Sequence, residues 1–170
     1  HQIKMQKIQG PEKLKSDLQL RKDMKSKIPK DYLPMWLRER EIETRQVEPV
    51  DLLKAEKLPP YRSTWMKPTG KLPSDERIHQ ALLLYVSDMG LLGAAVNPHE
   101  VNFMSKKFQS ASLDHVMWFH GKVNFNNWIL HHMHSPISQN ARGFSRGSIY
   151  TKAGKLVAST AQEGLMRIWD

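Results

Sequence analysis

Residues 74–98, SDERIHQALLLYVSDMGLLGAAVNP, decide the fold of this chain. Ser74 is a good helix N-cap, and two acidic residues follow it in the first turn, where the helix dipole favours negative charge. Beyond that turn, apolar residues cover nearly the whole circumference until Asn97-Pro98 stops the helix. A helix that is apolar on every side belongs inside a protein. We therefore predict one long buried helix over residues 75–96.

Strand-like segments flank this helix on both sides. Before it, Tyr61–Lys67 is rich in strand-forming residues and stops at the turn Pro68-Thr69-Gly70. After it come four further segments with strand character, residues 110–120, 127–134, 142–151 and 156–168. Pro136-Ile137-Ser138 is expected to end the second of these, and Lys152-Ala153-Gly154-Lys155 is typical of a hairpin turn. The pattern predicts an α+β hot-dog fold, in which an antiparallel β-sheet wraps around one long central helix.

The first 60 residues differ in character from the rest. They are charged and polar, and several prolines, including the pair Pro59-Pro60, interrupt any long regular element. Residues 41–53 alternate moderately between apolar and polar side chains, which permits one strand. We predict an interdomain linker or docking segment over residues 1–60, with a possible leading strand, and a hot-dog domain over residues 61–170.

The composition excludes several classes of protein. The chain has 170 residues, of which 39% are hydrophobic, and this suits one domain with a real core. It contains no cysteine, so a disulfide framework, a thiol nucleophile and a cysteine metal site are excluded. The longest apolar run, Ala81–Val86, is too short to span a bilayer. The formal net charge of +9 comes mainly from the first 45 residues. We interpret it as a solvated extension, although nucleic acid, anionic lipid or a phosphorylated ligand would also suit a basic chain.

Asp88 is the most informative polar residue, because it falls within the predicted buried helix. An unpaired buried carboxylate is costly, so a partner should compensate it. One interpretation is a structural contact with the backbone or with another chain. The other is a carboxylate at the edge of a pocket, where it orients or deprotonates a water.

Two further polar residues have chemistry that suits the same task. Gln162 lies late in the last predicted strand, on the face of Thr160, and its amide has the donors and the acceptor needed to hold a water. Taken alone, it is more simply an ordinary polar strand residue. Ser112 offers a hydroxyl that can hold a water without being acylated. A triad of Ser112, His115 and Asp114 is disfavoured, because neighbouring residues on a strand point to opposite faces.

Two other groups of residues are open to more than one interpretation. His132 and His134 share a strand face and could bind a metal, but no third ligand follows from the spacing, so packing or surface roles are the default. Residues 142–147, RGFSRG, are basic and glycine-rich but lack the spacing of a phosphate loop. They suit a twisted strand, or else a place where these arginines or Lys155 meet the phosphates of a ligand.

Taken together, these segments resemble the acyl-CoA thioesterase II family, whose members have two tandem hot-dog domains. The similarity covers roughly residues 60–170. The motifs that carry it stand in the family's order and are Arg77-Ile78-His79-Gln80, Val86-Ser87-Asp88, Leu113-Asp114-His115-Val116-Met117-Trp118-Phe119-His120, Ala141-Arg142-Gly143 and Val157-Ala158-Ser159-Thr160-Ala161-Gln162-Glu163-Gly164. Residues 1–60 resemble the linker and first strand that lead into the family's second domain, and the first domain has no counterpart in this sequence.

The resemblance implies a reaction and the residues that carry it. In the family, an aspartate of the central helix, a hydroxyl residue of the following strand and a glutamine of the last strand hold the attacking water. These positions match Asp88, Ser112 and Gln162. The family commonly has threonine at the second position, and serine keeps the hydroxyl but loses the methyl group that stiffens χ1. The implied reaction is direct hydrolysis of fatty acyl-CoA to fatty acid and CoA, with Asp88 as general base or orienter.

The resemblance also implies what surrounds the site. The oxyanion is expected to meet backbone N–H groups, commonly from a partner hot-dog domain that belongs to the same enzyme or to a second copy in a homo-oligomer. No metal and no cofactor are expected, since coenzyme A is part of the substrate, and neither are a nucleic-acid partner and a membrane span. Eukaryotic relatives are peroxisomal and bacterial ones cytoplasmic, and the long basic linker favours the peroxisome.

Two other functions stay open at this point. A non-catalytic hot-dog domain would serve assembly or acyl-CoA binding. A nucleic-acid-binding domain would need basic residues interleaved with exposed aromatic residues on one face. Most aromatic residues here lie in apolar strand segments instead, and the positive charge lies mostly elsewhere in the chain.

Overall fold

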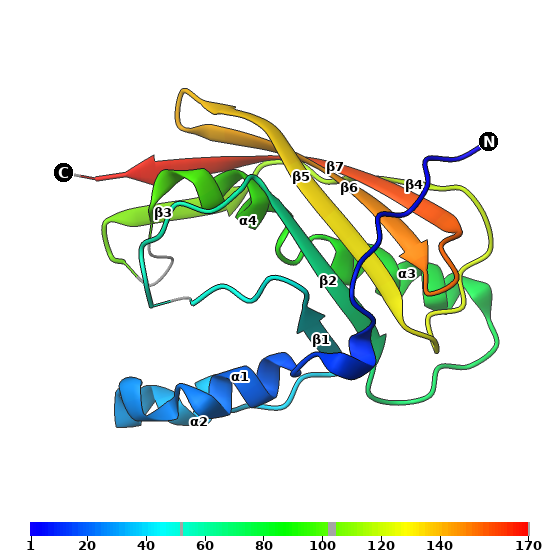
Figure 1. Cartoon of the computed structure of the whole chain (residues 1–170), viewed down its shortest axis with the longest axis horizontal. Coiled ribbons are helices and arrows are strands. Elements are labelled where there is room, and N and C mark those ends of the chain that lie inside the picture. Colours follow the sequence, from blue (N-terminus) through cyan, green and yellow to red (C-terminus); the bar gives the residue numbers. More distant parts are fainter. Residues whose placement is uncertain (52, 102–104, 170) are drawn as a thin grey trace.

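The computed structural model describes residues 1–51, 53–101 and 105–169. Its centre is a seven-stranded sheet in the order β1-β2-β5-β6-β7-β3, with β4 also paired to β7, and all the pairs are antiparallel (Figure 1). The strands are β1 (Ile42–Gln46), β2 (Tyr61–Pro68), β3 (Phe108–Ser112), β4 (Val116–Phe119), β5 (Ile129–Gln139), β6 (Arg142–Thr151) and β7 (Leu156–Ile168). The predicted strand segments thus form one sheet with the helical stretch on one of its faces.

The predicted central helix is present but interrupted. Glu76–Ser87 form α3 and Leu91–Val96 form α4. Between them, Gly90 has a φ of 86°, a left-handed conformation that costs other residues about 1–2 kcal/mol. The prediction of one continuous helix over residues 75–96 was wrong here, because a glycine lets the backbone turn while the apolar pattern continues on both sides.

Side chains fix both ends of this helical stretch. Asp75, not Ser74 as predicted, caps α3, and its carboxylate accepts a hydrogen bond from the backbone N–H of Arg77 at 3.0 Å. Asn97 ends α4 as predicted, and its side-chain oxygen accepts hydrogen bonds from the Arg62 guanidinium at 3.0 and 2.8 Å. Burial lowers the pKa of Arg62 to about 10. These contacts fasten the end of the helical stretch to β2.

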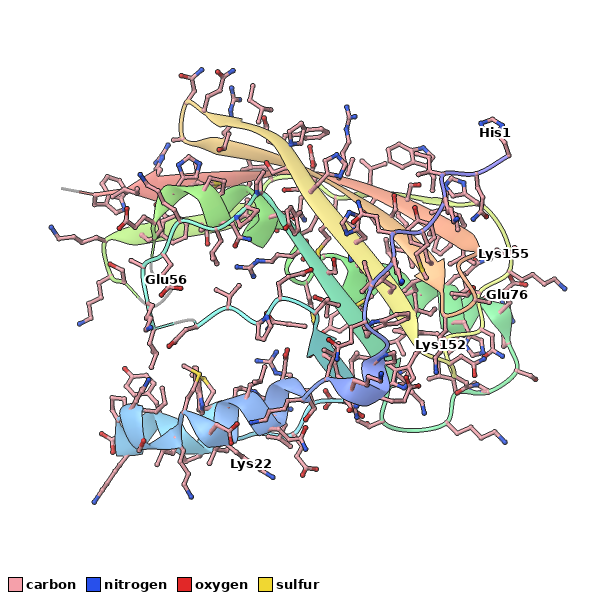
Figure 2. All side chains as sticks on the ribbon, viewed as in Figure 1. His1, Lys22, Glu56, Glu76, Lys152 and Lys155 are labelled. Carbon is pink, nitrogen blue, oxygen red and sulfur yellow. The ribbon has the colours of Figure 1, made fainter. Side chains whose placement is uncertain are left out.

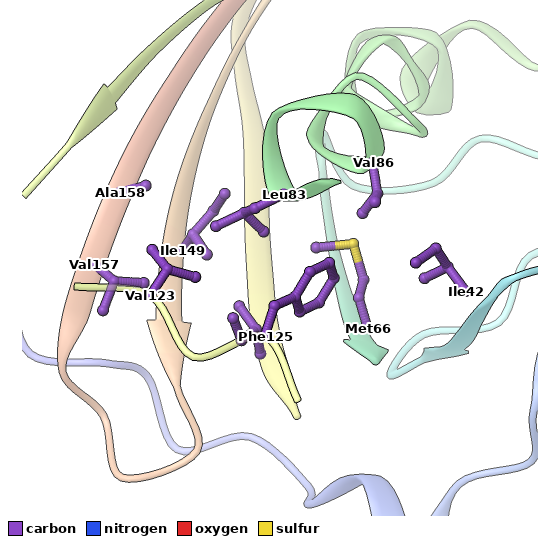
Figure 3. Packing of buried hydrophobic residues seen from close by; sticks show 10 residues of the cluster. Ile42, Met66, Leu83, Val86, Val123, Phe125, Ile149, Val157 and Ala158 are labelled. Atoms are coloured by element: carbon purple, nitrogen blue, oxygen red, sulfur yellow. The ribbon is translucent and has the colours of Figure 1, made fainter. Parts of the chain in front are cut away.

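One side of α3 packs on the sheet and the other side is exposed. Leu83 and Val86 point from the helix into the main apolar core, where they meet side chains from the strands (Figure 3). The other buried members of this core are Ile42, Met66, Val123, Phe125, Ile129, Ile149, Val157 and Ala158. On the opposite side of the helix, Leu84 and Tyr85 are exposed. The expectation of burial all round was therefore wrong, because the sheet covers only one side of α3.

The strand predicted over residues 110–120 is two strands, β3 and β4, and both pair with β7. Ser112 pairs with Gly164, and Val116 pairs with Ala161. The three residues between Ser112 and Val116 therefore lie opposite the two residues of β7 between Ala161 and Gly164. This mismatch of one residue is a β-bulge. The extra residue reverses the alternation of faces between β3 and β4.

The strand β5 continues past its predicted end at Pro136-Ile137-Ser138. Its pairing with β6 shifts in register between His134 and Ile137. Proline has no N–H for the ladder, and the irregularity accommodates it within the strand. The strands β6 and β7 match their predicted segments, and Gly154, with a φ of 84°, makes the turn between them.

The first 14 residues lie along the sheet face opposite to α3, whereas the helices that follow lie beyond the edge strand β1 (Figure 1). The helical elements of this N-terminal segment are η1 (Pro11–Lys13), α1 (Asp17–Asp23), η2 (Lys25–Lys27), η3 (Lys30–Tyr32) and α2 (Leu33–Trp36). Met5, Ile8 and Leu14 pack against a second apolar cluster around Trp65, and the Trp65 indole donates a hydrogen bond to the Gln9 carbonyl at 2.9 Å. The leading strand predicted within residues 41–53 is β1, at the edge of the sheet.

An ion pair ties the N-terminal segment to the far end of the sheet. Lys152 lies in the turn between β6 and β7 (Figure 2) and pairs with Glu12 of η1. The hydrogen bond to Lys152 is the main reason why the pKa of Glu12 lies below its ordinary value. Nearby, the Gln2 side chain donates to the Gly154 carbonyl at 2.8 Å.

The stretch Glu76–His99 is apolar enough to be examined as a membrane span. Among the described residues it is the one helical stretch that is long and apolar enough to cross a membrane, with 24 residues and a mean hydropathy of 1.3. Half of its most apolar window is buried inside the fold. Because core helices pass the same test, we interpret the stretch as the core of the domain.

Candidate active site

Asp88 lies at the C-terminal end of α3, not in the middle of a buried helix as predicted. It is the C-cap residue that follows Ser87, and it is exposed to solvent. The turn at Gly90 explains this position, since the chain leaves the helix axis there before α4 begins. The Asp88 carboxylate therefore lies at an open surface where a ligand can reach it.

Ser112 and Gln162 both donate hydrogen bonds to one oxygen of Asp88. The Ser112 hydroxyl, at the end of β3, lies 3.2 Å from Asp88 Oδ1. The Gln162 amide nitrogen, on β7, donates to the same oxygen. Within the described part of the chain, no hydrogen bond reaches Asp88 Oδ2. The structure thus brings together three residues that the sequence places on different elements.

Gln162 differs from the other two residues because it is buried, with 1% of its surface exposed. Its Oε1 is enclosed and has no hydrogen-bond partner among the described residues. The neighbouring residue on β6 is Ser145, whose buried hydroxyl also has no partner within that part of the chain. Buried polar atoms are normally hydrogen-bonded. The interior side of the site therefore has unused hydrogen-bonding capacity next to Asp88.

His115 also joins the site, although strand alternation predicted that it would face away from Ser112. Its Nε2 lies 2.8 Å from the Ser87 hydroxyl, and its Nδ1 lies 3.4 Å from the amide nitrogen of Gln162. The bulge between β3 and β4 explains the difference, because one extra residue turns His115 to the side of Ser112. Sequence reasoning missed this residue because it assumed one regular strand.

The Asp114 side chain bonds to the backbone of β7 at the bulge and makes no hydrogen bond to the His115 ring among the described residues. Its carboxylate accepts a hydrogen bond from the Glu163 backbone N–H at 2.7 Å. The backbone N–H groups of Leu113 and Asp114 in turn donate to the Glu163 carbonyl at 2.9 and 3.4 Å. The disfavoured triad of Ser112, His115 and Asp114 is therefore not formed. The aspartate itself, a residue that is depleted in strands and favours turns, was the local signal of an irregular strand in the sequence.

His131 is buried on the face of the sheet that also carries Thr160. Its Nε2 lies 3.1 Å from the Thr160 hydroxyl, and burial is the main reason why its pKa falls to about 3. A Cβ atom on Gly147 would collide with this ring and with Thr160, so the glycine provides the space that the ring occupies. His132 lies 3.0 Å from the Ser63 hydroxyl, and burial lowers its pKa as well. Over the described ranges, no three His, Asp or Glu side chains are placed to hold a metal ion.

The basic residues of β6 lie at the surface. Arg142 is 3.7 Å from Glu163, and the Arg146 guanidinium lies 5.4 Å from the centre of the Phe144 ring. Lys155 is exposed beyond the end of the strand. A strand of ten residues is about 33 Å long. One phosphate group therefore cannot contact both Arg142 and Lys155.

Exposed apolar side chains lie on the elements that carry the site, and two of them, Met89 and Leu113, directly follow Asp88 and Ser112 in the chain. We call this set the apolar rim; it consists of Leu84, Tyr85 and Met89 from the helix side and Leu113, Val116, Trp118 and Phe119 from the strand side. On β4, Phe119 pairs with Ala158 and shares the sheet face of Gln162, whereas Val116 and Trp118 pair with Ala161 and Ser159 on the opposite face. Exposed apolar side chains of this size along an edge strand are typical of an interaction surface.

A pocket of about 550 Å³ lies elsewhere in the molecule, between α1 and β1. Its lining is largely polar and charged and includes Arg21, Arg40 and Thr69. None of the three predicted site residues lines it. This hollow and the hydrogen-bonded carboxylate of Asp88 are therefore separate features of the molecule.

Sequence comparison places the chain in a known family. The family model for acyl-CoA thioesterase matches residues 36–165. The chain belongs to the acyl-CoA thioesterase family. It is 33% identical over 167 residues to acyl-CoA thioesterase 2 of Haemophilus influenzae, which covers 98% of this chain and 58% of that protein. It is 30% identical over 175 residues to human acyl-coenzyme A thioesterase 8, and this match covers 99% of this chain and 54% of that protein.

Solved structures of acyl-CoA thioesterases and of other hot-dog proteins confirm the predicted fold. The acyl-CoA thioesterase II TesB2 from Mycobacterium marinum has a TM-score of 0.73 at 28% identity, over 99% of this chain and 57% of its own. A hot-dog protein from Alicyclobacillus acidocaldarius has a TM-score of 0.65 at 13% identity. The match covers 98% of this chain and 56% of that protein. The resemblance to the acyl-CoA thioesterase II family is thus confirmed. The chain spans a little over half the length of these relatives.

Proposed function

We propose that this chain is the C-terminal domain of an acyl-CoA thioester hydrolase in which a water attacks the thioester directly. The observation that carries the proposal is the convergence of Ser112 and Gln162 on one carboxylate oxygen of Asp88. Family membership supplies the substrate class, acyl-CoA, because the relatives are named acyl-CoA thioesterases. Asp88, Ser112 and Gln162 are the proposed catalytic residues.

In this mechanism Asp88 acts as general base or orienter of the water. Ser112 and Gln162 hold Oδ1, so Oδ2 is left to accept a hydrogen bond from a water beside the Ser112 hydroxyl. As the water oxygen bonds to the thioester carbon, the carboxylate takes one of its protons and the carbonyl electron pair moves onto oxygen. Collapse of the tetrahedral intermediate breaks the C–S bond. The CoA sulfur then receives the proton, and the fatty acid is released.

A second hot-dog domain is part of the proposal. Asp88 and Ser112 are exposed on this chain, whereas catalysis of this kind benefits from a site that excludes bulk water. The apolar rim offers a contact surface beside them, and β4 pairs only with β7 among the described strands, so its other edge can accept a further strand. The partner is the other hot-dog domain of the same enzyme or a second copy in a homo-oligomer. Its backbone N–H groups would meet the oxyanion.

The cellular location belongs to the proposal too. The family resemblance leaves the peroxisome and the cytoplasm, and the basic N-terminal extension is our reason for proposing the peroxisome. A fluorescent fusion of the full-length protein, imaged with a peroxisomal marker, distinguishes the two. A diffuse signal would favour the cytoplasm.

The proposed function is tested by measuring release of the CoA thiol from a series of saturated acyl-CoA esters, with and without the second hot-dog domain. We expect hydrolysis by the assembled enzyme and much slower hydrolysis by this chain alone. If the assembled enzyme binds acyl-CoA but releases no thiol, the chain is a non-catalytic hot-dog domain. Steeply salt-dependent binding to DNA would instead favour the nucleic-acid interpretation.

A further inference from the structure

The His115 ring bridges the end of α3 and the buried amide of Gln162. One ring nitrogen, Nε2, lies 2.8 Å from the Ser87 hydroxyl oxygen. The other, Nδ1, lies 3.4 Å from Gln162 Nε2. Ser87 is fully buried and Gln162 nearly so. The ring is therefore held between two groups that have little freedom to move.

The hydrogen bonds of Ser87 determine which nitrogen of His115 carries the proton. The Ser87 hydroxyl has one hydrogen, and it lies 2.8 Å from the Leu84 carbonyl oxygen, which can only accept. Its other near neighbour, the Met117 sulfur at 3.8 Å, is also only an acceptor. Towards His115 the Ser87 oxygen must therefore accept. The donor is Nε2–H, and in the neutral ring Nδ1 is left as an acceptor.

This tautomer in turn determines the orientation of the Gln162 amide. The amide nitrogen has two hydrogens, and its two neighbours, Asp88 Oδ1 and His115 Nδ1, are both acceptors. A reversed amide would place Oε1 against a carboxylate oxygen and an imidazole lone pair, which is repulsive. With the amide in the observed orientation, Oε1 points into the enclosed interior.

We propose that His115 and Ser87 are positioning residues that hold the Gln162 amide as a donor to Asp88. The chain of hydrogen bonds runs from Leu84 through Ser87 and His115 to Gln162, and so connects the last turn of α3 to the carboxylate by a second route. Neither His115 nor Ser87 contacts the substrate in this scheme. The inference deepens the proposed function and rests on it, because it assigns a purpose to the Gln162 orientation that hydrolysis requires.

The first test compares steady-state kinetics of His115→Leu and Ser87→Ala in the assembled enzyme. Each change removes one hydrogen bond of the chain, and we expect kcat to fall by about three- to tenfold, with KM unchanged. His120→Leu is the matched control, because His120 lies beyond the other end of β4 and its Nε2 is 2.9 Å from Ser159. Equal kcat values for the two variants and the control would overturn the proposal.

The second test uses nitrogen NMR of the assembled enzyme with labelled histidine and does not depend on activity. The His115 signals, identified by their loss in His115→Leu, should report protonated Nε2 and unprotonated Nδ1. In Ser87→Ala the preference for this tautomer should weaken. A resting ring protonated at Nδ1 would overturn the inference even if the variants fold poorly. If the wild-type enzyme hydrolyses no acyl-CoA, the proposed function fails, while the NMR result still decides the orientation.

Discussion

Asp88 is a carboxylate that two uncharged donors hold by the same oxygen. A hydroxyl from β3 and an amide from β7 fix its direction, and neither donor brings a positive charge that would neutralise it. The residue is at the surface at the end of a helix, so a water can approach its second oxygen. These features suit a group that must accept a proton during a reaction.

The first prediction concerns Asp88→Asn in the assembled enzyme. The change keeps the size of the side chain but removes the base, so kcat for acyl-CoA is expected to fall by about 10²- to 10⁴-fold. Steady-state thiol release measures it. Asp75→Asn is the matched control, because Asp75 caps the other end of α3 and asparagine caps equally well. Full activity in Asp88→Asn would exclude this mechanism.

At the level of residues, the sequence identified the three site positions through family motifs, and the structure brings them together. It could not identify His115. The face that a strand residue occupies follows from strict alternation only if no bulge intervenes, and the bulge between Ser112 and Val116 reverses it. Burial of Asp88 was also mistaken, since the apolar pattern around it does not show that the helix ends there.

At the level of elements, the break between α3 and α4 decides where the carboxylate lies. The second prediction is that Gly90→Ala lowers the free energy of unfolding by about 1–2 kcal/mol, because alanine is strained at a φ of 86°. Apart from the neighbouring backbone, no atom of the described residues lies within 4 Å of the added Cβ, so crowding does not contribute. Urea denaturation measures the change.

The control for this prediction is Gly70→Ala. Gly70 also has nothing within 4 Å of an added Cβ, but its φ is not positive. Its stability should be unchanged or slightly raised. Equal stabilities of the two alanine variants would show that the backbone at position 90 tolerates a side chain. The Gly90 variant should also lose activity, because straightening of the helical stretch moves Asp88 away from Ser112.

The third prediction concerns the buried His131 of β5. Its pKa is about 3 in the folded protein, and about 6.5 in the unfolded chain. As the pH falls below 6.5, the unfolded chain binds a proton that the folded protein does not, so folding becomes less favourable. The loss approaches about 1.4 kcal/mol for each pH unit until the folded pKa is reached.

Denaturation of wild type and His131→Leu between pH 7 and pH 4.5 measures this contribution. The variant should have a shallower decline in unfolding free energy than the wild type over this range. His134→Leu, at an exposed position on the same strand, should keep the steeper wild-type slope. Parallel slopes for all three proteins would contradict the assigned burial of His131.

The elements were predicted with unequal success for physical reasons. The hairpin of β6 and β7 is local, with alternating strands joined by a glycine turn, so its bounds could be predicted. The helix break and the continuation of β5 past Pro136 depend on tertiary contacts, namely the packing of the helical stretch on the sheet and the pairing of β5 with β6. Local preference alone does not determine such irregularities.

At the level of the whole molecule, the first 14 residues pack on one face of the sheet. The fourth prediction compares two identical substitutions, Ile8→Ala and Ile3→Ala. Ile8 packs against the cluster around Trp65, whereas Ile3 is 75% exposed. We expect Ile8→Ala to lower the unfolding free energy by about 1–2 kcal/mol and Ile3→Ala to change it by less than about 0.5 kcal/mol. Thermal or urea denaturation decides, and equal effects would mean that the segment is not packed in solution.

The fifth prediction concerns the apolar rim. Trp118→Glu should weaken association with the second hot-dog domain, because a charge on a buried contact is costly. Trp169→Glu is the matched control, since the two tryptophans are 51% and 52% exposed and only Trp118 belongs to the rim. Analytical ultracentrifugation of each variant with the second domain measures association. Equal association of both variants would remove the rim from the interface.

The lack of a side chain at Gly147 has a consequence for how this family can evolve. The space above Gly147 is filled by the imidazole of His131 and the hydroxyl of Thr160. A larger residue at 147 is thus compatible only with smaller side chains at 131 and 160, and position 147 should vary together with these two positions among homologous sequences. In a double-mutant cycle, Gly147→Ala should harm the protein less when His131 has already been replaced by alanine. Covariation of positions 131 and 147 in homologous sequences would therefore indicate the contact between β5 and β6, which neither position indicates by itself.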